Sequence, residues 1–360
     1  MEALYRLLTL KIPLKVNFRV KQKDLVNMKK KHLICGIKAQ PPIVDDAFPH
    51  EIKLEESCWV IEEEEDLLFT SEKMASPFSL NQGPLDEETQ ALAKEELRET
   101  PEMMKTGIEK LREYLNNDES LNFKDTDEYL TIFLRPCKWD PKGAYDLMKR
   151  IAEFKEKHKG LLENLLPDEE KPAFTEHNVV NILTNLDHKG RRVLLVFAGE
   201  TWDPSKVTSD QIFRMFYLIH EMAVLEPKTQ VRGVVVIMDY DGMGMKQVRG
   251  LGPAFSLLLL TFIQDAMPLR LKEVHMVKEP FVFNMVWQLF KPFLKPKLKG
   301  RIFFHGKKMS SLHKYMAPSH LPKNYDGELP AIDYSGKDWY PVIEDHMDHM
   351  KLMSTFGYKK

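Results

Sequence analysis

The sequence predicts an α/β fold in which a small helical bundle precedes a sheet with helices around it. Two segments, RRVLLVFAGETWD (residues 191–203) and RGVVVIMDYDG (residues 232–242), contain continuous aliphatic runs bounded by turn residues. Such runs are typical of strands buried on both faces. The segment SDQIFRMFYLIHEMAVLEP between them predicts a helix that begins at Ser209 or Asp210 and ends at Pro227. Strand, helix and strand at this spacing predict a crossover unit.

The elements before and after this unit follow from the same patterns. Residues 85–166 predict the helical bundle, because apolar residues recur there at helical spacing in a charge-rich background. Its members include a helix from Asp127 to Leu134, which Pro136 ends, and a helix in PKGAYDLMKRIAEFKEKH. After the unit we expect, in order, a helix over residues 253–265, a strand over 271–277, a helix over 281–290 and a strand over 301–305.

Composition and length exclude several classes of protein. The 360 residues are 43% hydrophobic and 29% charged, which indicates a globular chain of about two domains. The longest uncharged stretch, Gly250 to Gln264, has fifteen residues, whereas a membrane-spanning helix needs roughly 18 or more. The cysteines Cys35, Cys58 and Cys137 form no CxxC pair. They therefore predict neither a disulfide framework nor a zinc site, and they indicate a reducing compartment.

The net charge of -2 conceals a sorting of charges along the chain. Residues 1–40 hold ten Lys/Arg and two acids, whereas residues 45–66 hold ten Asp/Glu and one Lys. Residues 270–301 hold eight Lys/Arg and two acids. Sorting of this kind indicates separate segments that meet separate partners.

The two ends of the chain show weaker patterns. Residues 1–73 lack sustained periodicity and predict a disordered extension, whose basic opening suits a mitochondrial-type presequence or a membrane-surface helix. A second start of translation at Met74 is the alternative. Residues 331–360 are expected to form a C-terminal tail. His346 and His349, interleaved with Asp345 and Asp348, suggest either a weak metal site or, as we interpret them, a solvated tail.

Three segments carry a family resemblance. EYLTIFLRPCKWDPKGAYDLMK, DYDGMG and MPLRLKEVHMVKEPFVFNMVWQLFKPFLKPKLKGRIFFHG resemble the CRAL-TRIO family, most of all its α-tocopherol transfer and retinaldehyde-binding branch. The resemblance covers about residues 85–330. It implies an N-terminal helical bundle at 85–166 and a CRAL-TRIO domain at 172–330, with a mixed sheet floor and a mobile helical lid at roughly 281–292. One hydrophobic ligand, such as tocopherol, a retinoid or a similar lipid, would lie between floor and lid.

The resemblance also assigns residues to a ligand pocket. By itself, a stripe of aromatic and methionine side chains at helical spacing usually belongs to the hydrophobic core. The resemblance instead favours its assignment to the wall of a ligand pocket. His220 and Phe216 replace small hydroxyl residues of the tocopherol-binding relatives, which implies a reshaped cavity. His220 is expected to hydrogen-bond an alcohol or carbonyl head group or, equally, to be a satisfied core histidine. The expected wall residues are Phe213, Phe216, His220, Val234, Met238, Phe262, Ile263, Met267 and Trp287.

A basic patch is expected to bind an anionic membrane. The resemblance aligns Arg270, Lys297 and Arg301 with residues that hold phosphoinositide head groups, including phosphatidylinositol bisphosphate, in this branch. The stretch KPFLKPKLKGRIFFHGKK supports this independently, since it holds seven Lys/Arg and no acid. A fourth basic position is Cys137 here, which puts full phosphoinositide binding in question. Nucleic acid is set aside, because no recognition motif accompanies the patch.

Enzyme motifs are missing from the sequence. No G-x-S-x-G or Walker sequence is present, and DYDGMG lacks the third glycine of a dinucleotide fingerprint. We therefore expect a monomeric cytoplasmic protein without catalytic residues, metal or cofactor. It would transfer lipid between membranes and associate peripherally with endosomal or other phosphoinositide-containing membranes. The alternatives are a membrane-trafficking adaptor that does not shuttle lipid and an α/β enzyme.

Overall fold

The computed structural model describes residues 78–359 and, within residues 1–77, six strands. The chain divides into two compact units, residues 1–77 and residues 78–360. The strands of the first unit form two antiparallel three-stranded sheets, in the orders β1-β6-β5 and β2-β3-β4. Their bounds are β1 (Leu7–Pro13), β2 (Val26–Lys29), β3 (His32–Cys35), β4 (Val44–Ala47), β5 (Cys58–Glu62) and β6 (Asp66–Glu72).

These strands differ from the disordered extension expected for residues 1–73. Each strand is only four to seven residues long, and runs this short leave little periodicity for a sequence pattern to register. Most of the basic opening, with the presequence expected there, lies outside the described residues.

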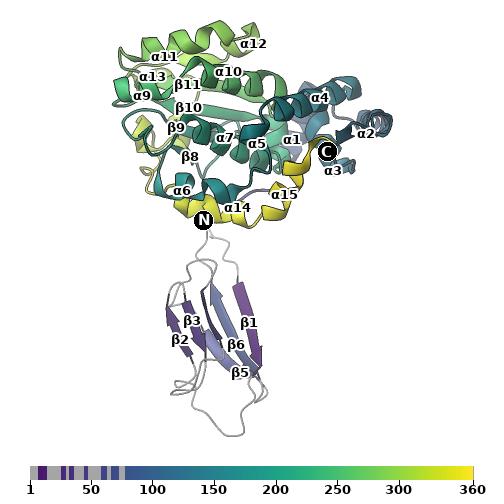
Figure 1. Ribbon diagram of the computed structural model, residues 1–360, viewed down its shortest axis with the longest axis vertical. Helices are drawn as coiled ribbons and strands as arrows, with labels where there is room; N and C mark the ends of the chain where they lie inside the picture. The colour runs from purple at the N-terminus through teal and green to yellow at the C-terminus, as the bar shows by residue number, and fades with distance from the viewer. Residues whose placement is uncertain are drawn as a thin grey trace. The chain divides into compact units, whose positions relative to one another are not determined.

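The second unit is built on a mixed five-stranded sheet of order β12-β11-β10-β9-β8 (Figure 1). β8 is antiparallel to β9, and the remaining neighbours are parallel. The α/β class and the mixed sheet predicted from the sequence are thus confirmed. The strands are β8 (Val180–Ile182), β9 (Arg192–Phe197), β10 (Val234–Asp239), β11 (Leu271–Val277) and β12 (Ile302–Phe304).

Side chains that alternate along the strands supply two separate cores. Val193 and Leu195 of β9 and Val235 and Ile237 of β10 belong to one cluster, with α13 (Met309–Leu312) and Tyr325. Leu194, Val196 and Val236 belong to a second, larger cluster. Because successive strand residues point to opposite faces, both faces of the sheet are covered. The prediction of strands buried on both faces is confirmed.

Helices of the N-terminal bundle lie where the apolar periodicity predicts them. Thr100 caps α2 through its side chain, and Asp140 caps α4 in the same way. β7 (Leu121–Asn122) pairs with β13 (Gly357–Tyr358) near the end of the chain. The helices of the bundle are α1 (Glu87–Leu97), α2 (Pro101–Asn116), α3 (Asp127–Leu134), α4 (Pro141–Lys157) and α5 (Lys159–Leu162). Helix α6 (Pro167–Glu176) lies beyond residue 166, the expected end of the bundle, and was not predicted.

The crossover helix α7 (Ser209–Ala223) begins one residue earlier than a cap at Ser209 would allow. Thr208 is the cap, and it forms a reciprocal capping box with Gln211. Pro227 does not end α7 but opens the next helix, where its missing N–H costs nothing. The later helices are α8 (Pro227–Arg232), α9 (Met245–Gly250), α10 (Pro253–Thr261) with a π turn at Phe262–Ala266, α11 (Phe283–Phe290) and α12 (Pro296–Lys299); short 3-10 turns lie at Lys291–Phe293, Pro318–His320 and Lys323–Tyr325.

The expected C-terminal tail contains two packed helices, α14 (Gly336–Glu344) and α15 (Met347–Thr355), drawn yellow in Figure 1. Trp339 and Tyr340 of α14 are buried and pack against Phe174 of α6. The interpretation of residues 346–349 as a solvated tail is wrong for His349, which is buried. Its ring nitrogens bond the Tyr129 hydroxyl and the Glu221 carbonyl rather than a metal.

A buried polar cluster joins the bundle, α7 and α15. The Tyr217 hydroxyl hydrogen-bonds the Glu221 carboxylate, and burial raises the pKa of Glu221 to about 7 against the opposing charge of Lys155. The Lys155 ammonium donates to the carbonyls of Met353 and Ser354, both at 3.0 Å. His349 Nε2 donates to the Glu221 carbonyl over 3.0 Å. Four helices, α3, α4, α7 and α15, therefore meet at this cluster.

The raised pKa of Glu221 predicts a pH dependence of stability. The folded state binds a proton that the unfolded chain releases near pH 4.5, so this stabilisation is present below that pH and is lost as pH rises toward about 7. We expect Glu221→Gln to raise the thermal midpoint relative to wild type by several degrees more at pH 8 than at pH 4.5. About 1 kcal/mol shifts such a midpoint by roughly 2–4 °C.

Differential scanning calorimetry of the full chain at both pH values checks this, with Glu113→Gln on the exposed face of α2 as the matched loss of a carboxylate. A midpoint difference between Glu221→Gln and wild type that is the same at both pH values would contradict the prediction.

Candidate functional site

Two apolar cavities lie against one face of the sheet. The larger, here called the lid cavity, has a volume of about 130 Å³ and lies between the sheet, α10 and α11. Its floor is made by side chains of β9, β10 and β11, namely Val196, Val236, Met238, Val274 and Met276. These strand positions alternate with those of the opposite core. The register of the strands therefore sets which side chains form the floor.

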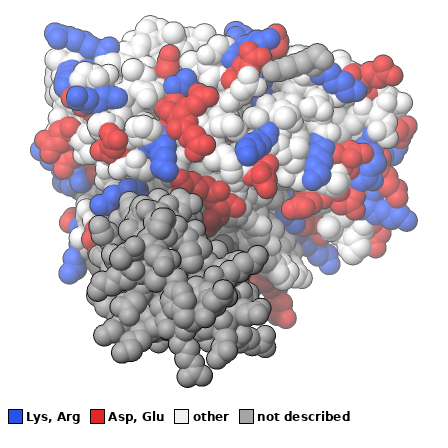
Figure 2. All heavy atoms as spheres, turned by 60° about the horizontal axis from the view of Figure 1, so that its bottom comes forward, with Lys and Arg blue, Asp and Glu red and all other residues white. Residues whose placement is uncertain are grey.

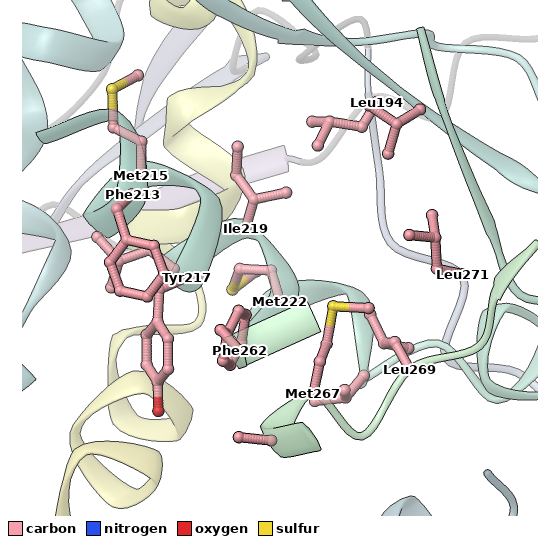
Figure 3. Close-up of a cluster of buried hydrophobic side chains, with 14 of the residues drawn as sticks. Leu194, Phe213, Met215, Tyr217, Ile219, Met222, Phe262, Met267, Leu269 and Leu271 are labelled. Atoms are coloured by element: carbon pink, nitrogen blue, oxygen red, sulfur yellow. The ribbon is translucent and has the colours of Figure 1, made fainter. Parts of the chain in front are cut away.

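The smaller cavity, here called the inner cavity, has a volume of about 60 Å³ and lies between the sheet, α7 and α14. In Figure 3, Ile219 and Met222 of α7 lie across from Leu194 and Leu271 of the sheet, with Met267 and Leu269 at one side. Phe216, Val236 and Leu271 line both cavities. The two spaces are thus neighbours separated by these shared side chains.

The wall residues expected from the sequence divide into two groups. Seven line a cavity, and the structure places them as follows: His220, Val234 and Met267 at the inner cavity, Met238, Ile263 and Trp287 at the lid cavity, and Phe216 at both. Phe213 and Phe262 line neither. Both are fully buried one layer behind the wall, where their rings lie 6.1 and 5.5 Å from that of Phe154 of α4.

Several wall residues were not named individually from the sequence. The aliphatic residues of α10 line the lid cavity, but their helix is apolar all round and gives no sign of which side faces inward. Trp339, Val342 and Ile343 of α14 line the inner cavity although the segment was expected to be a tail. Their i, i+3, i+4 spacing was the available signal.

The expected lid corresponds to α11. Its inner face presents Phe283, Val286, Trp287 and Phe290 to the lid cavity, at the i, i+3, i+4 and i+7 positions of one helical stripe. Phe281, just before the helix, is 92% exposed, and Met285 on the outer face is 51% exposed. In Figure 1, α11 and α12 lie on the side of α10 away from α14 and α15. One face of α11 therefore borders the lid cavity. The exposed side chains of Phe281 and Met285 form an apolar rim on the solvent side.

A short connection fixes the start of this helix to the sheet. Lys278 follows β11 and has a left-handed backbone with φ of 55°. Its ammonium bonds the Asp239 carboxylate over 3.0 Å, and its backbone N–H donates to the Gly306 carbonyl over 2.7 Å. Pro280 follows two residues later. The contacts hold the chain at Lys278, so any movement of α11 has to occur beyond it.

Two of the three basic residues expected at a phosphoinositide groove lie together. The Arg270 guanidinium donates to the Val231 carbonyl, and that of Arg301 to the Leu271 carbonyl. Burial and the neighbouring charge of Arg270 lower the pKa of Arg301. Glu96 of α1 bonds Arg270 and also Lys272, the latter over 2.8 Å. Glu96, Arg270, Lys272 and Arg301 form what is here called the Glu96 cluster.

Glu96 was not foreseen as part of this site. The pKa of its carboxyl falls to about 2, because the hydrogen bonds and charges of Lys272 and Arg270 outweigh the opposing effect of burial. The pKa of Lys272 is lowered by burial and by the like charges of Arg270 and Arg301, although Glu96 opposes this. A carboxylate therefore occupies the position between cations that an anionic head group would need.

Lys297 of α12 is exposed and does not take part in the ion pairs that Glu96 makes with Arg270 and Lys272. Its charge acts on Cys137, the position for which the family resemblance implies a fourth basic residue. Burial raises the pKa of the Cys137 thiol to about 11, so this side chain is neutral. On the face shown in Figure 2, Lys/Arg and Asp/Glu side chains are interleaved.

Within residues 78–359 and the strands of the first unit, no helix is long and apolar enough to cross a bilayer. In the same described residues, no cluster of three or more His, Cys, Asp or Glu is placed to hold a metal ion.

Comparison with known proteins identifies two domains. The family model of the CRAL/TRIO domain matches residues 176–327, and that of the CS domain matches residues 6–73, the segment of β1 to β6. Clavesin-1 of Pongo abelii is 32% identical over 255 residues, which span 70% of this chain and 72% of that protein. Clavesin-2 of Homo sapiens is 31% identical over 268 residues, 74% of this chain and 81% of that protein.

Among solved structures, the crystal structure of Sfh5 matches 74% of this chain and all of its own, with 14% identity and a TM-score of 0.42. The curated relatives, at above 30% identity over more than two thirds of their length, decide the assignment. This chain belongs to the CRAL-TRIO family of lipid-binding proteins.

Proposed function

We propose that the protein binds one hydrophobic lipid between the sheet and α11 and carries it between membranes. The observation that supports this most directly is the lid cavity, whose lining is aliphatic, aromatic and methionine side chains. Such linings suit polarizable hydrocarbon ligands. Tocopherol, a retinoid or a lipid of similar size is the ligand class that we propose, in line with the branch that the sequence resembles.

Burial of an apolar ligand in the protein offsets the free energy that the ligand loses when it leaves a membrane. Removing ~500 Å² of ligand surface from water at ~25 cal/mol per Å² contributes about 12 kcal/mol before ordering costs. The two cavities, at about 130 and 60 Å³, are small beside the ~300–1,000 Å³ of small-molecule sites. Entry of a whole lipid therefore requires the shared side chains to move, and Phe216, which is half-buried, is the first that would rotate.

The lid opens, in this proposal, where a membrane replaces its contacts with the cavity. Phe281 and Met285 project from the lid region, and Phe304 of β12 is 47% exposed with its ring 4.9 Å from that of Trp287. Lys291 follows α11 directly and Lys295 precedes α12; both are exposed, and Lys295 is paired with Asp265. Apolar side chains among lysines suit the interface of an anionic leaflet. The lid would then exchange protein contacts for lipid contacts, which couples release of the ligand to docking.

Phosphoinositide head groups are the docking partner that we propose for Arg270, Lys297 and Arg301. The protein would act as a cytoplasmic monomer, associated peripherally with endosomal or other phosphoinositide-containing membranes. The adaptor alternative predicts membrane binding without an enclosed lipid, and an α/β enzyme predicts turnover of a substrate. Organic extraction of the purified full chain and mass spectrometry of the extract distinguish them, since a carrier yields about one lipid per chain.

Filling the lid cavity tests the binding site. Leu259 and Leu257 both belong to α10, but only Leu259 lines the cavity, whereas Leu257 is 44% exposed. We expect Leu259→Trp to occupy the space of the ligand and to lower the lipid recovered per chain at least fivefold. Leu257→Trp should leave it unchanged. Equal lipid content in the two folded variants, measured by mass spectrometry, would place the ligand elsewhere.

Charge reversal tests the docking surface. Lys297→Glu is expected to weaken binding to vesicles that contain phosphatidylinositol bisphosphate by about tenfold or more, since each basic side chain near an anionic leaflet contributes about 1 kcal/mol and reversal adds repulsion. Lys323→Glu, an exposed change in the 3-10 turn beside the opposite core, is the control. Cosedimentation measures both, and equal losses would show a non-specific effect of net charge.

Removal of the Glu96 carboxylate should strengthen binding to phosphoinositide vesicles, the opposite of the effect expected for Lys297→Glu. Glu96→Gln frees Arg270 and Lys272 from their acidic partner, so we expect severalfold tighter binding to the same phosphoinositide vesicles. Binding to neutral phosphatidylcholine vesicles should not change. Unaltered or weaker phosphoinositide binding by a Glu96→Gln protein with a wild-type thermal midpoint would mean that this cluster is purely structural.

A further inference from the structure

His220 lines the inner cavity and has one ring nitrogen without a hydrogen-bond partner; the residue also borders a small pocket of about 10 Å³ beside Lys155 and Glu221. The residue is 5% exposed, and its Nε2 is buried with no hydrogen-bond partner. It follows Phe216 by one helical turn on α7, and both side chains line the inner cavity. Its ring also contacts Phe262, with centroids 5.0 Å apart. A buried polar atom left unpaired costs stability, so a missing partner is chemically informative.

The other nitrogen of the ring fixes what this partner must be. His220 Nδ1 lies 2.9 Å from the Tyr217 carbonyl oxygen, which accepts hydrogen bonds and never donates them. Nδ1 therefore carries the proton. Burial lowers the pKa of His220 to about 4, so the ring is neutral near pH 7 and Nε2 is a bare acceptor.

The remaining polar side chains of the inner cavity already have partners. Arg192 and Glu226 are paired with each other, and Trp339 Nε1 donates to Asn181 over 2.8 Å. Glu226 also accepts from Thr229 over 2.7 Å. Among the described residues that line this cavity, only His220 has an unpartnered side-chain nitrogen or oxygen. One acceptor in an otherwise apolar or satisfied wall defines a single polar subsite.

We infer that the inner cavity takes the head group of a lipid bearing a free hydroxyl, an alcohol or a phenol, which donates its hydrogen to His220 Nε2. The apolar remainder of the lipid passes the shared residues Phe216, Val236 and Leu271 into the lid cavity. This inference rests on the proposed function and narrows its ligand class. It also chooses between the two head groups that the sequence leaves open at His220, alcohol and carbonyl.

Carbonyl and carboxylate head groups are disfavoured for a stated chemical reason. An aldehyde, ketone or ester offers only acceptor atoms, which face the Nε2 lone pair without a proton between them. An ionised carboxylate would require a protonated ring, and burial opposes that protonation. A hydroxyl group supplies the missing donor at no change of charge.

A competition between matched lipids tests this. Purified full-length protein is incubated with phosphatidylcholine vesicles holding equimolar amounts of an alcohol and its carbonyl counterpart, then reisolated, and both lipids are quantified by mass spectrometry. The pairs are 1-octadecanol with octadecanal, cholesterol with cholest-4-en-3-one, and retinol with retinal. For the pair that binds, we expect roughly fivefold enrichment of the alcohol, the value of one hydrogen bond of about 1 kcal/mol.

His220→Leu and Met222→Leu complete the design, since both residues lie on α7 and line the inner cavity. The first should abolish the alcohol preference while lipid is still bound, and the second should retain it. Equal binding of alcohol and carbonyl by the wild type would overturn the inference, as expected if water caps Nε2. Recovery of no lipid from any pair would instead refute the proposed function. The ratio of alcohol to carbonyl lipid bound by the wild type tests the inference even if His220→Leu fails to fold.

Discussion

The alternation of side chains along β9 and β10 is the constraint on which the rest of the second unit depends. Val235 and Ile237 of β10 pack into the core beside α13, whereas Val236 and Met238 of the same strand form the cavity floor. A shift of the strand by one residue would exchange these sets. The tightly packed opposite face therefore fixes the register, which leaves the other face free to border unfilled space without losing the fold.

The sequence predicted this arrangement well where a pattern is local. The apolar runs of β9 and β10, the helices of the bundle and the strand at 271–277 all follow from periodicity within one segment. Phe213 and Phe262 show the limit. Helical spacing places a residue on an apolar stripe, but α7 has apolar neighbours on two sides, α4 and the sheet, and spacing does not tell them apart. Their partner Phe154 lies far away in sequence.

What the sequence did not predict depends on distant partners or on short elements. Glu96 is an ordinary helix-surface carboxylate until the fold brings it to Arg270, 174 residues later. α14 has only nine residues, and its burial depends on α6 and on the inner cavity. The strands of residues 1–77 are shorter still, in a charge-sorted context that suggested disorder. The family models recover such domains because they read many weak positions together.

In the proposed function, helix α7 would link ligand recognition to the stability of the second unit. His220 lines the inner cavity, and the next residue, Glu221, belongs to the polar cluster that joins α3, α4 and α15. Tyr217 contributes to both, since its carbonyl fixes the His220 tautomer and its hydroxyl bonds Glu221. A ligand hydroxyl at Nε2 would therefore be held by a ring whose orientation is set by backbone. That backbone is anchored by a cluster outside the cavity, so the acceptor would stay in place during the proposed movement of the lid and Phe216.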